Sequence, residues 1–146
     1  MNKEKRLWIA LFIVLTLMLI LSGCSGLPKT AKINITIEPN PVPYSSQNER
    51  WSFDIVLYES NGVGVTLSSL RFDDYNQAEQ LYFTQYLYEE DIIDWFGSNY
   101  LPAFSSLQVS VYHTSSVSKF SLITVEGVDD NNKPIEATGR VDFLPQ

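Results

Sequence analysis

The sequence is poor in the residues that form the most easily recognised sites. Its 146 residues include one cysteine and one histidine. One cysteine cannot form an internal disulfide, and the two residues together cannot supply the ligands of a structural zinc site. No nucleophile elbow, phosphate-binding loop or zinc-ligand spacing occurs. These absences exclude a disulfide scaffold and the metal and catalytic sites that have clear sequence patterns.

Basic residues are also scarce. The chain has 10 Lys and Arg against 17 Asp and Glu, a net charge of −7. The first 23 residues hold three of the basic residues and one acidic residue, so the remainder has 7 and 16, a net charge of −9. Nucleic-acid binding needs clustered Lys and Arg, as does a basic membrane-surface patch. We therefore expect no nucleic-acid partner.

The N-terminal segment has the order of a targeting sequence. Lys3, Lys5 and Arg6 precede residues 7–21, an almost wholly apolar run of 15 residues. A membrane-spanning helix needs about 20 such residues, whereas 15 is typical of the hydrophobic region of a signal peptide. The run ends in Leu21-Ser22-Gly23-Cys24. An uncleaved signal anchor and an ordinary buried cysteine are the alternatives.

Leu21-Ser22-Gly23-Cys24 resembles the lipobox of bacterial lipoproteins. The resemblance implies that diacylglycerol is attached to the Cys24 thiol, that the signal peptide is cut between Gly23 and Cys24, and that a further acyl chain such as palmitate is added to the new amine. It divides the chain into a signal peptide (1–23), a short tether (24–30) and one domain (31–146). The expected location is the extracytoplasmic side of the cell membrane or of the outer membrane. In a host with two membranes, the resemblance implies the outer membrane, because Ser25 and not Asp follows the lipidated cysteine.

The domain contains a series of short segments in which apolar and polar residues alternate, as in half-buried strands. Asn61-Gly62 predicts a tight hairpin between the second and third segments. Acidic residues followed by Gly97 predict one short helix over residues 89–97. The predicted strands are 33–38, 51–57, 63–72, 80–88, 107–112, 120–128 and 135–143.

About seven strands in roughly 110 residues predict an antiparallel β-sandwich. The chain also resembles the immunoglobulin-like domains of bacterial surface proteins, in its proline-rich first strand, in Trp51, in Glu59…Gly62-Val63-Gly64-Val65 and in a closing hairpin. That hairpin contains Val125-Glu126-Gly127-Val128-Asp129-Asp130 and Gly139-Arg140-Val141. Two features depart from the family: there is no cysteine pair, and a tight hairpin stands where an immunoglobulin chain would cross between sheets.

An aromatic strand offers the best candidate binding surface. Alternation over residues 80–88 predicts that Leu81, Phe83 and Leu87 face the core. The other face would then present Tyr82, Tyr86 and Tyr88 as a strip for sugar rings or a protein partner. Equally, tyrosines favour strands and can pack under loops with only the hydroxyl exposed.

The turn Asp129-Asp130-Asn131-Asn132 is rich in side-chain oxygens, which hard cations such as Ca²⁺ prefer. The same residue types are ordinary in hairpin turns, so Asp129, Asp130 and Asn131 are weak metal candidates and no cofactor is expected. The acidic residues at 89–94 are expected to complement the helix N-terminus.

No catalytic constellation emerges. His113 ends a predicted strand and is expected at the surface, and the neighbours Asp73 and Asp74 should point to opposite faces. The expected function is therefore that of a lipid-anchored envelope protein whose sandwich binds or spaces without catalysis. The alternatives are a module that binds carbohydrate or cell wall through the tyrosine strip and, much less favoured, a small envelope hydrolase. The expected partners are the membrane through Cys24 and an envelope protein or glycan.

Overall fold

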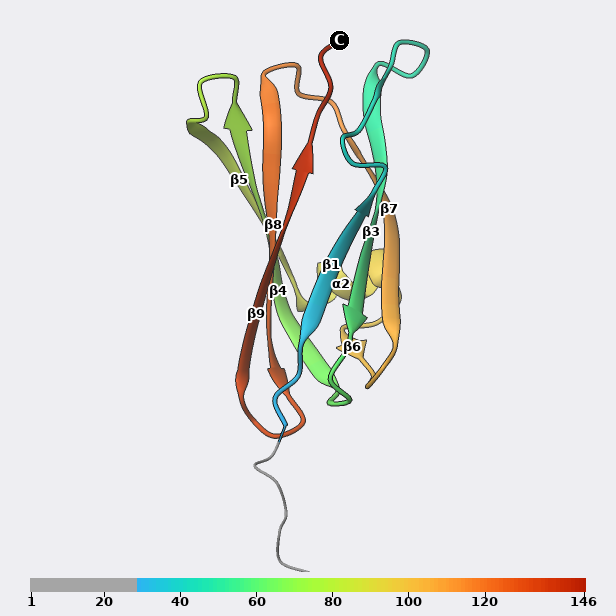
Figure 1. Ribbon diagram of the computed structural model, residues 1–146, viewed down its shortest axis with the longest axis vertical. Helices are drawn as coiled ribbons and strands as arrows, with labels where there is room; N and C mark the ends of the chain where they lie inside the picture. The colour runs from blue at the N-terminus through green and yellow to red at the C-terminus, as the bar shows by residue number, and fades with distance from the viewer. Residues whose placement is uncertain (1–28) are drawn as a thin grey trace, which may run out of the picture.

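The computed structural model describes residues 29–146, which form two antiparallel sheets and one short helix (Figure 1). The elements are β1 (Ile33–Glu38), β2 (Tyr44–Ser45), β3 (Arg50–Glu59), β4 (Val65–Asn76), β5 (Leu81–Tyr88), α2 (Glu89–Phe96), β6 (Tyr100–Leu101), β7 (Ser106–His113), β8 (Ser118–Asp129) and β9 (Pro134–Asp142). Within this part of the chain, no helix has the length and apolar character needed to cross a membrane. The predicted signal peptide and the predicted lipidation site Cys24 lie outside the described residues.

One sheet is built around β3, with β7 along one edge and β1 followed by β2 along the other. The second sheet has the order β5-β4-β8-β9, and β6 continues the edge of β4 beyond β5. Seven of the described strands have six or more residues. The predicted all-β sandwich with one short helix is therefore confirmed.

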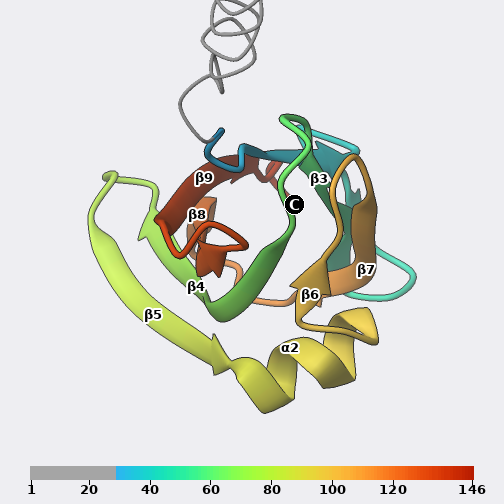
Figure 2. The same ribbon diagram turned by 90° about the horizontal axis from the view of Figure 1, so that it is seen from below.

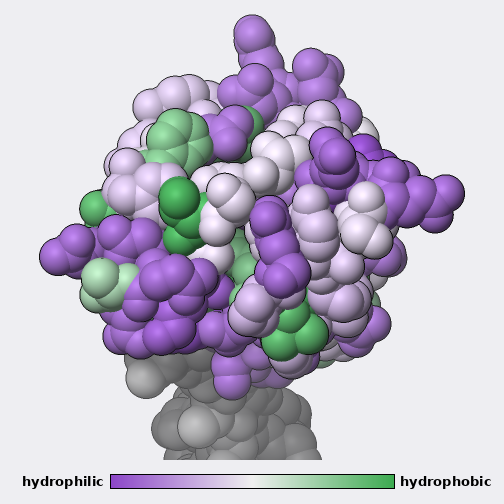
Figure 3. All heavy atoms as spheres, turned by 90° about the horizontal axis from the view of Figure 1, so that it is seen from above, coloured by the Kyte–Doolittle hydropathy of each residue, from purple (hydrophilic) through white to green (hydrophobic). Residues whose placement is uncertain are grey.

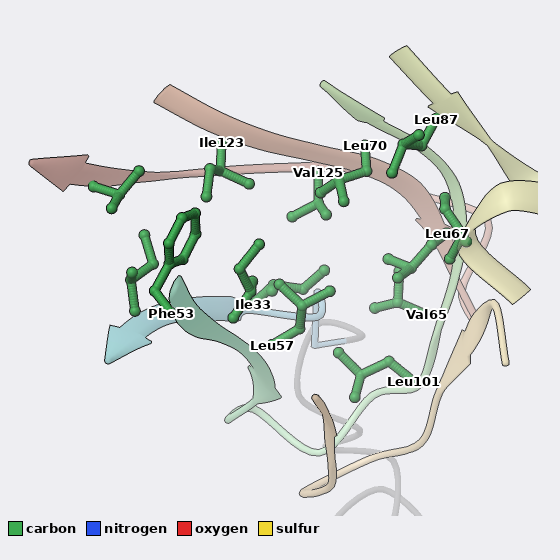
Figure 4. Close-up of a cluster of buried hydrophobic side chains, with 14 of the residues drawn as sticks. Ile33, Phe53, Leu57, Val65, Leu67, Leu70, Leu87, Leu101, Ile123 and Val125 are labelled. Carbon is green, nitrogen blue, oxygen red and sulfur yellow. The ribbon is translucent and has the colours of Figure 1, made fainter. Parts of the chain in front are cut away.

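The core lies between the inward faces of the two sheets. Ile123 and Val125 of β8 and Leu70 of β4 face Phe53 and Leu57 of β3 (Figure 4). In β3 every second residue is buried, because successive side chains of a strand point to opposite faces. That alternation is the pattern that predicted the strands.

The short helix forms where the acidic segment was expected. The Asp91 carboxylate accepts a hydrogen bond from the Tyr88 backbone N–H at 3.0 Å, and Gly97 ends α2 with a φ of 77°. Glycine adopts this left-handed conformation without a steric penalty. Figure 2 shows α2 following β5 and reaching across toward β6 and β7. The helix thus spans one open flank of the sandwich.

The predicted hairpin at Asn61-Gly62 is wrong, because β3 and β4 belong to different sheets. The chain crosses between the sheets around the side chain of Glu59, which is fully buried. Its carboxylate accepts hydrogen bonds from the backbone N–H groups of Lys32, Asn61, Gly62, Val63 and Phe104, at 2.8–3.3 Å. An Asn-Gly pair specifies a tight turn, but here the buried carboxylate organises the crossing.

The two ends of β3 mark the two ends of the domain. Near Glu59, the Lys32 backbone leads into β1, so the described chain begins at this end of the domain (Figure 1). At the other end, Trp51 pairs with His113. A ten-residue strand spans about 30 Å at ~3.3 Å per residue, so His113 lies far from Lys32.

Candidate functional site

A cleft of about 390 Å³ lies between the two sheets on the flank where β5 and β7 are the edge strands. The opposite flank is closed, because β1 packs against β9. Five strands, the helix α2, the loop between β7 and β8 and the segment after β9 supply the lining residues: Phe53, Phe72, Asp74, Tyr82, Phe83, Gln85, Trp95, Val111, Tyr112, His113, Thr114, Ser115, Ser121 and Phe143. Volumes of roughly 300–1,000 Å³ are typical of small-molecule sites. The cleft is therefore large enough to hold a ligand.

Seven of the fourteen lining residues of the cleft are Phe, Tyr or Trp. The Phe72 and Trp95 rings are 6.0 Å apart, and the Phe53 and Phe143 rings are also 6.0 Å apart. His113 stacks on Phe143 with ring centroids 4.6 Å apart and an interplanar angle of 11°. In the space-filling view onto the end of the domain away from the tether, hydrophobic residues reach the surface in small groups between hydrophilic ones (Figure 3).

The predicted tyrosine strip is corrected, because Tyr82 does not share a face with Tyr86 and Tyr88. Asp74 and Tyr75 of β4 pair with Phe83 and Leu81, which leaves Tyr82 as an extra residue in β5. Such a bulge turns the bulged side chain away from the regular alternation. Tyr82 accordingly lines the cleft.

Tyr86 and Tyr88 stack on each other outside the cleft, with ring centroids 6.1 Å apart and an interplanar angle of 8°. The predicted core set is corrected as well: Leu87 is buried, but Leu81 and Phe83 are about half exposed. They lie on an edge strand, near the end where the cleft opens between the sheets.

Hydroxyl groups converge on His113 at the end of the cleft. His113 Nε2 lies 2.5 Å from Ser118 Oγ, and Ser118 Oγ lies 2.5 Å from the Tyr82 hydroxyl. The Tyr82 hydroxyl also donates a hydrogen bond to Ser115 Oγ at 2.9 Å. The histidine side chain is only 17% exposed, so the expected surface position of His113 is corrected. In the sequence, His113 is a lone histidine at the largely apolar end of a strand, and nothing there predicted these hydrogen-bonding partners.

Asp74 supplies the cleft with a carboxylate. Its Oδ1 accepts a hydrogen bond from Ser121 Oγ, and its Oδ2 lies 3.9 Å from His113 Nδ1. Asp73, the preceding residue, points to the outer face, where it pairs with Arg71 at 2.9 Å and accepts a hydrogen bond from Thr84. The two neighbours point to opposite faces as expected, but they lie within β4 and not in a turn.

Burial lowers the pKa of His113, and the Asp74 carboxylate and the Ser115 backbone offset only part of this effect. We expect an NMR titration of the imidazole to give a pKa below the ordinary 6.5. The contribution of neutral His113 to stability is then complete above pH 6.5 and is lost as the pH falls through the lowered pKa. The variant His113→Gln should lose stability less steeply over that acidic range. A measured pKa at or above 6.5 would contradict this assignment.

The oxygen-rich turn has a structural role. Asp129 is buried, and its carboxylate accepts hydrogen bonds from the backbone N–H groups of Ala31, Asn131 and Lys133. Asp130 accepts a hydrogen bond from the Tyr100 hydroxyl, and the Asn131 amide donates to the Lys29 carbonyl. Across residues 29–146, no three His, Cys, Asp or Glu side chains are grouped as metal ligands. The turn thus joins the start of the domain to the β8–β9 hairpin.

Comparison with known proteins adds little to this geometry. No family model matches the chain, and no curated protein matches it. One similar solved structure is the structural genomics target SoR45, with 10% identity, a TM-score of 0.48, and coverage of 80% of this chain and 89% of that one. Another is a Bordetella pertussis protein provisionally assigned as ApaA, with 12% identity, a TM-score of 0.44, and coverage of 81% and 98%. Both TM-scores are below 0.5, so neither likeness bears on what this chain binds.

Proposed function

We propose that this chain is a lipid-anchored envelope protein whose β-sandwich binds a small ligand, without catalysis, in the cleft between β5 and β7. The observation that carries the proposal is the cleft itself: aromatic walls, a few converging polar groups and one buried carboxylate. Mostly apolar pockets with a few placed polar groups are the usual form of small-molecule sites.

The position of the cleft suits a tethered receptor. His113 pairs with Trp51 near the start of β3, and Tyr82 is hydrogen-bonded to Ser115 close by. The described chain begins near the other end of β3, where Glu59 accepts a hydrogen bond from the Lys32 N–H. A lipid on Cys24 would hold the tether end at the bilayer, while the polar end of the cleft would lie about one strand length above it. Ligands arriving from the surroundings would then reach the cleft without contacting the membrane.

Ser118, His113 and Asp74 lie next to one another in space as the serine, histidine and aspartate of a catalytic triad do. Their geometry, however, differs from that of a triad. Ser118 is 3% exposed and is not among the residues that line the cleft. The 3.9 Å separation of His113 and Asp74 is also too long for the hydrogen bond that orients a catalytic imidazole. These features support binding without turnover.

The test compares ligand retention in matched variants. Gln85 is exposed at the cleft, so Gln85→Trp should block the cleft without entering the core. Gln108→Trp changes an exposed residue of β7 that does not line the cleft. Each mature lipoprotein, purified from membranes in detergent, is incubated with an envelope extract and washed, and released molecules are identified by mass spectrometry.

We expect the wild type and Gln108→Trp to retain the same molecule with unchanged mass, and Gln85→Trp to retain at least tenfold less. A conversion product among the released molecules would contradict the non-catalytic proposal. Equal retention by Gln85→Trp, or no retention by the wild type, would contradict binding in the cleft.

One observation favours a second candidate function, carbohydrate binding on the outer face. The stacked Tyr86 and Tyr88 rings are 50% and 62% exposed, and exposed aromatic rings can stack on sugars. In this case Tyr86→Ala/Tyr88→Ala should abolish binding on a glycan array, whereas Gln85→Trp should leave it unchanged. Loss of glycan binding in Gln85→Trp alone would place the sugar in the cleft instead.

A further inference from the structure

The cleft contains a carboxylate that no cation of its wall neutralises. Asp74 is 6% exposed, and its single hydrogen-bonding partner in the structure is the hydroxyl of Ser121. His113 is the one other Asp, Glu, Lys, Arg or His among the lining residues. Because burial lowers the pKa of His113, its imidazole is neutral near pH 7 and leaves the Asp74 charge uncompensated.

The nearby cations make their contacts outside the cleft or at its rim, where the Arg50 guanidinium lies over the Tyr112 ring, 4.9 Å from its centroid. Arg71 pairs with Asp73 on the outer face of β4. Lys119 pairs with Glu79 at 2.7 Å. Arg140 pairs with Asp142 at 2.6 Å. None of these basic residues lines the cleft. With a net charge of −9 on residues 24–146, the field of the whole domain also favours a positive ligand.

The aromatic walls of the cleft also suit a positively charged ligand. The faces of Phe and Trp rings carry partial negative charge and attract ammonium and guanidinium groups, most strongly where water is excluded. Phe72 and Trp95 lie on one side of the cleft, and Phe53 and Phe143 contribute from the first sheet and the C-terminal segment. Aromatic walls around a buried carboxylate form a suitable environment for an organic cation.

We infer that the cleft binds an organic cation, an ammonium or guanidinium group carried on an aromatic or aliphatic skeleton. The inference rests on the proposed function, because it names the class of ligand for the same cleft. The cationic group contacts Asp74, and the skeleton packs against Phe72 and Trp95. The cation is carried either by a free small amine or by a lysine or arginine side chain of a peptide.

The experiment uses probes of nearly equal shape and different charge. Tyramine carries an ammonium group, and tyrosol carries a hydroxyl at the same position. A lysine with blocked backbone ends, N-acetyl-lysine methylamide, represents a peptide side chain. Each is titrated into the mature lipoprotein in detergent, and the Trp95 indole NMR signal reports binding in the cleft.

Two neighbouring residues provide the matched variants. Asp74→Asn removes the carboxylate of the cleft, whereas Asp73→Asn removes a carboxylate of the outer face from the same strand.

We expect tyramine or the blocked lysine to bind the wild type at least tenfold more tightly than tyrosol. Asp74→Asn should abolish that preference and Asp73→Asn should retain it. If tyramine binds more tightly than the blocked lysine, the ligand is a free small amine; if the blocked lysine binds more tightly, the ligand is a peptide side chain. A thermal melt of each variant confirms that it is folded.

The inference would be overturned if neither tyramine nor the blocked lysine bound the wild type more tightly than tyrosol does, or if the preference survived Asp74→Asn. Failure of both cations to bind at millimolar concentration would also overturn it. These results leave the proposed function standing, because ligand binding in the cleft is tested separately by the retention experiment with Gln85→Trp.

Discussion

Replacement of Glu59 by glutamine is expected to lower the free energy of unfolding by about 3–5 kcal/mol. The carboxylate accepts five backbone hydrogen bonds where the chain crosses from β3 to β4. Glutamine keeps one acceptor oxygen and turns an NH₂ group toward amide donors, so several buried N–H groups lose their partner. In a domain of this size, such a loss lowers the melting temperature by roughly 10–20 °C.

Glu136→Gln is the matched control, because Glu136 is exposed on β9 opposite Glu126. It should change stability by no more than about 0.5 kcal/mol. Equal melting temperatures for Glu59→Gln and Glu136→Gln would show that the buried carboxylate does not organise the crossing.

The Glu59 variant should also change the response to acid. Burial alone would raise the pKa of Glu59, but hydrogen bonds from backbone amides outweigh it, and the pKa lies below the ordinary 4.5. A lowered carboxyl pKa stabilises the fold fully above the unfolded-state pKa, and the contribution is lost as the pH falls through the folded-state pKa. Chemical denaturation between pH 7 and pH 2 should therefore show a shallower acid loss for Glu59→Gln than for the wild type.

The variant Cys24→Ala is expected to incorporate no labelled palmitate and to keep residues 1–23. Under the proposed lipid anchoring, the Cys24 thiol carries the lipid and the cut falls before it, as the resemblance of residues 21–24 to a lipobox implies. Each buried methylene contributes about 0.8 kcal/mol, so every long acyl chain contributes roughly 10 kcal/mol to membrane attachment. Metabolic labelling and intact-mass measurement of the purified protein test both expectations.

A second variant separates lipid anchoring from the apolar segment. Replacing residues 1–24 by a secretory signal peptide without a lipobox should release the domain from the membrane, because the change removes the proposed site of lipid attachment. Label in Cys24→Ala, cleavage at the same position, or membrane retention of the second variant would contradict a lipid anchor at Cys24.

The strands could be predicted because their signal is local. In β3, burial falls on Trp51, Phe53, Ile55 and Leu57, as the alternation of apolar and polar residues indicates. Glu59 continues the same parity, and a carboxylate at a core-facing position was a sign of its structural role. The sheet to which the next strand belongs was not predictable from Asn61-Gly62, because a turn signal specifies no partner strand.

Only parts of the candidate site could be predicted from the sequence. Tyr82 was singled out for its aromatic side chain, but a bulge places it in the cleft, and bulges depend on the pairing of two strands. Asp74 was assigned to the face opposite Asp73, yet its proximity to His113 depends on two sheets meeting. Trp95, Phe143 and Ser121 approach one another only after folding, so no spacing in the sequence marks them.

The most direct test of binding between the sheets is a crystal structure of the mature lipoprotein with the retained envelope molecule bound. We predict that the molecule lies between β5 and β7, with its skeleton on Trp95 and a positively charged nitrogen about 3 Å from a carboxylate oxygen of Asp74. A molecule bound on the outer face, against Tyr86 and Tyr88 and outside the cleft, would contradict the account.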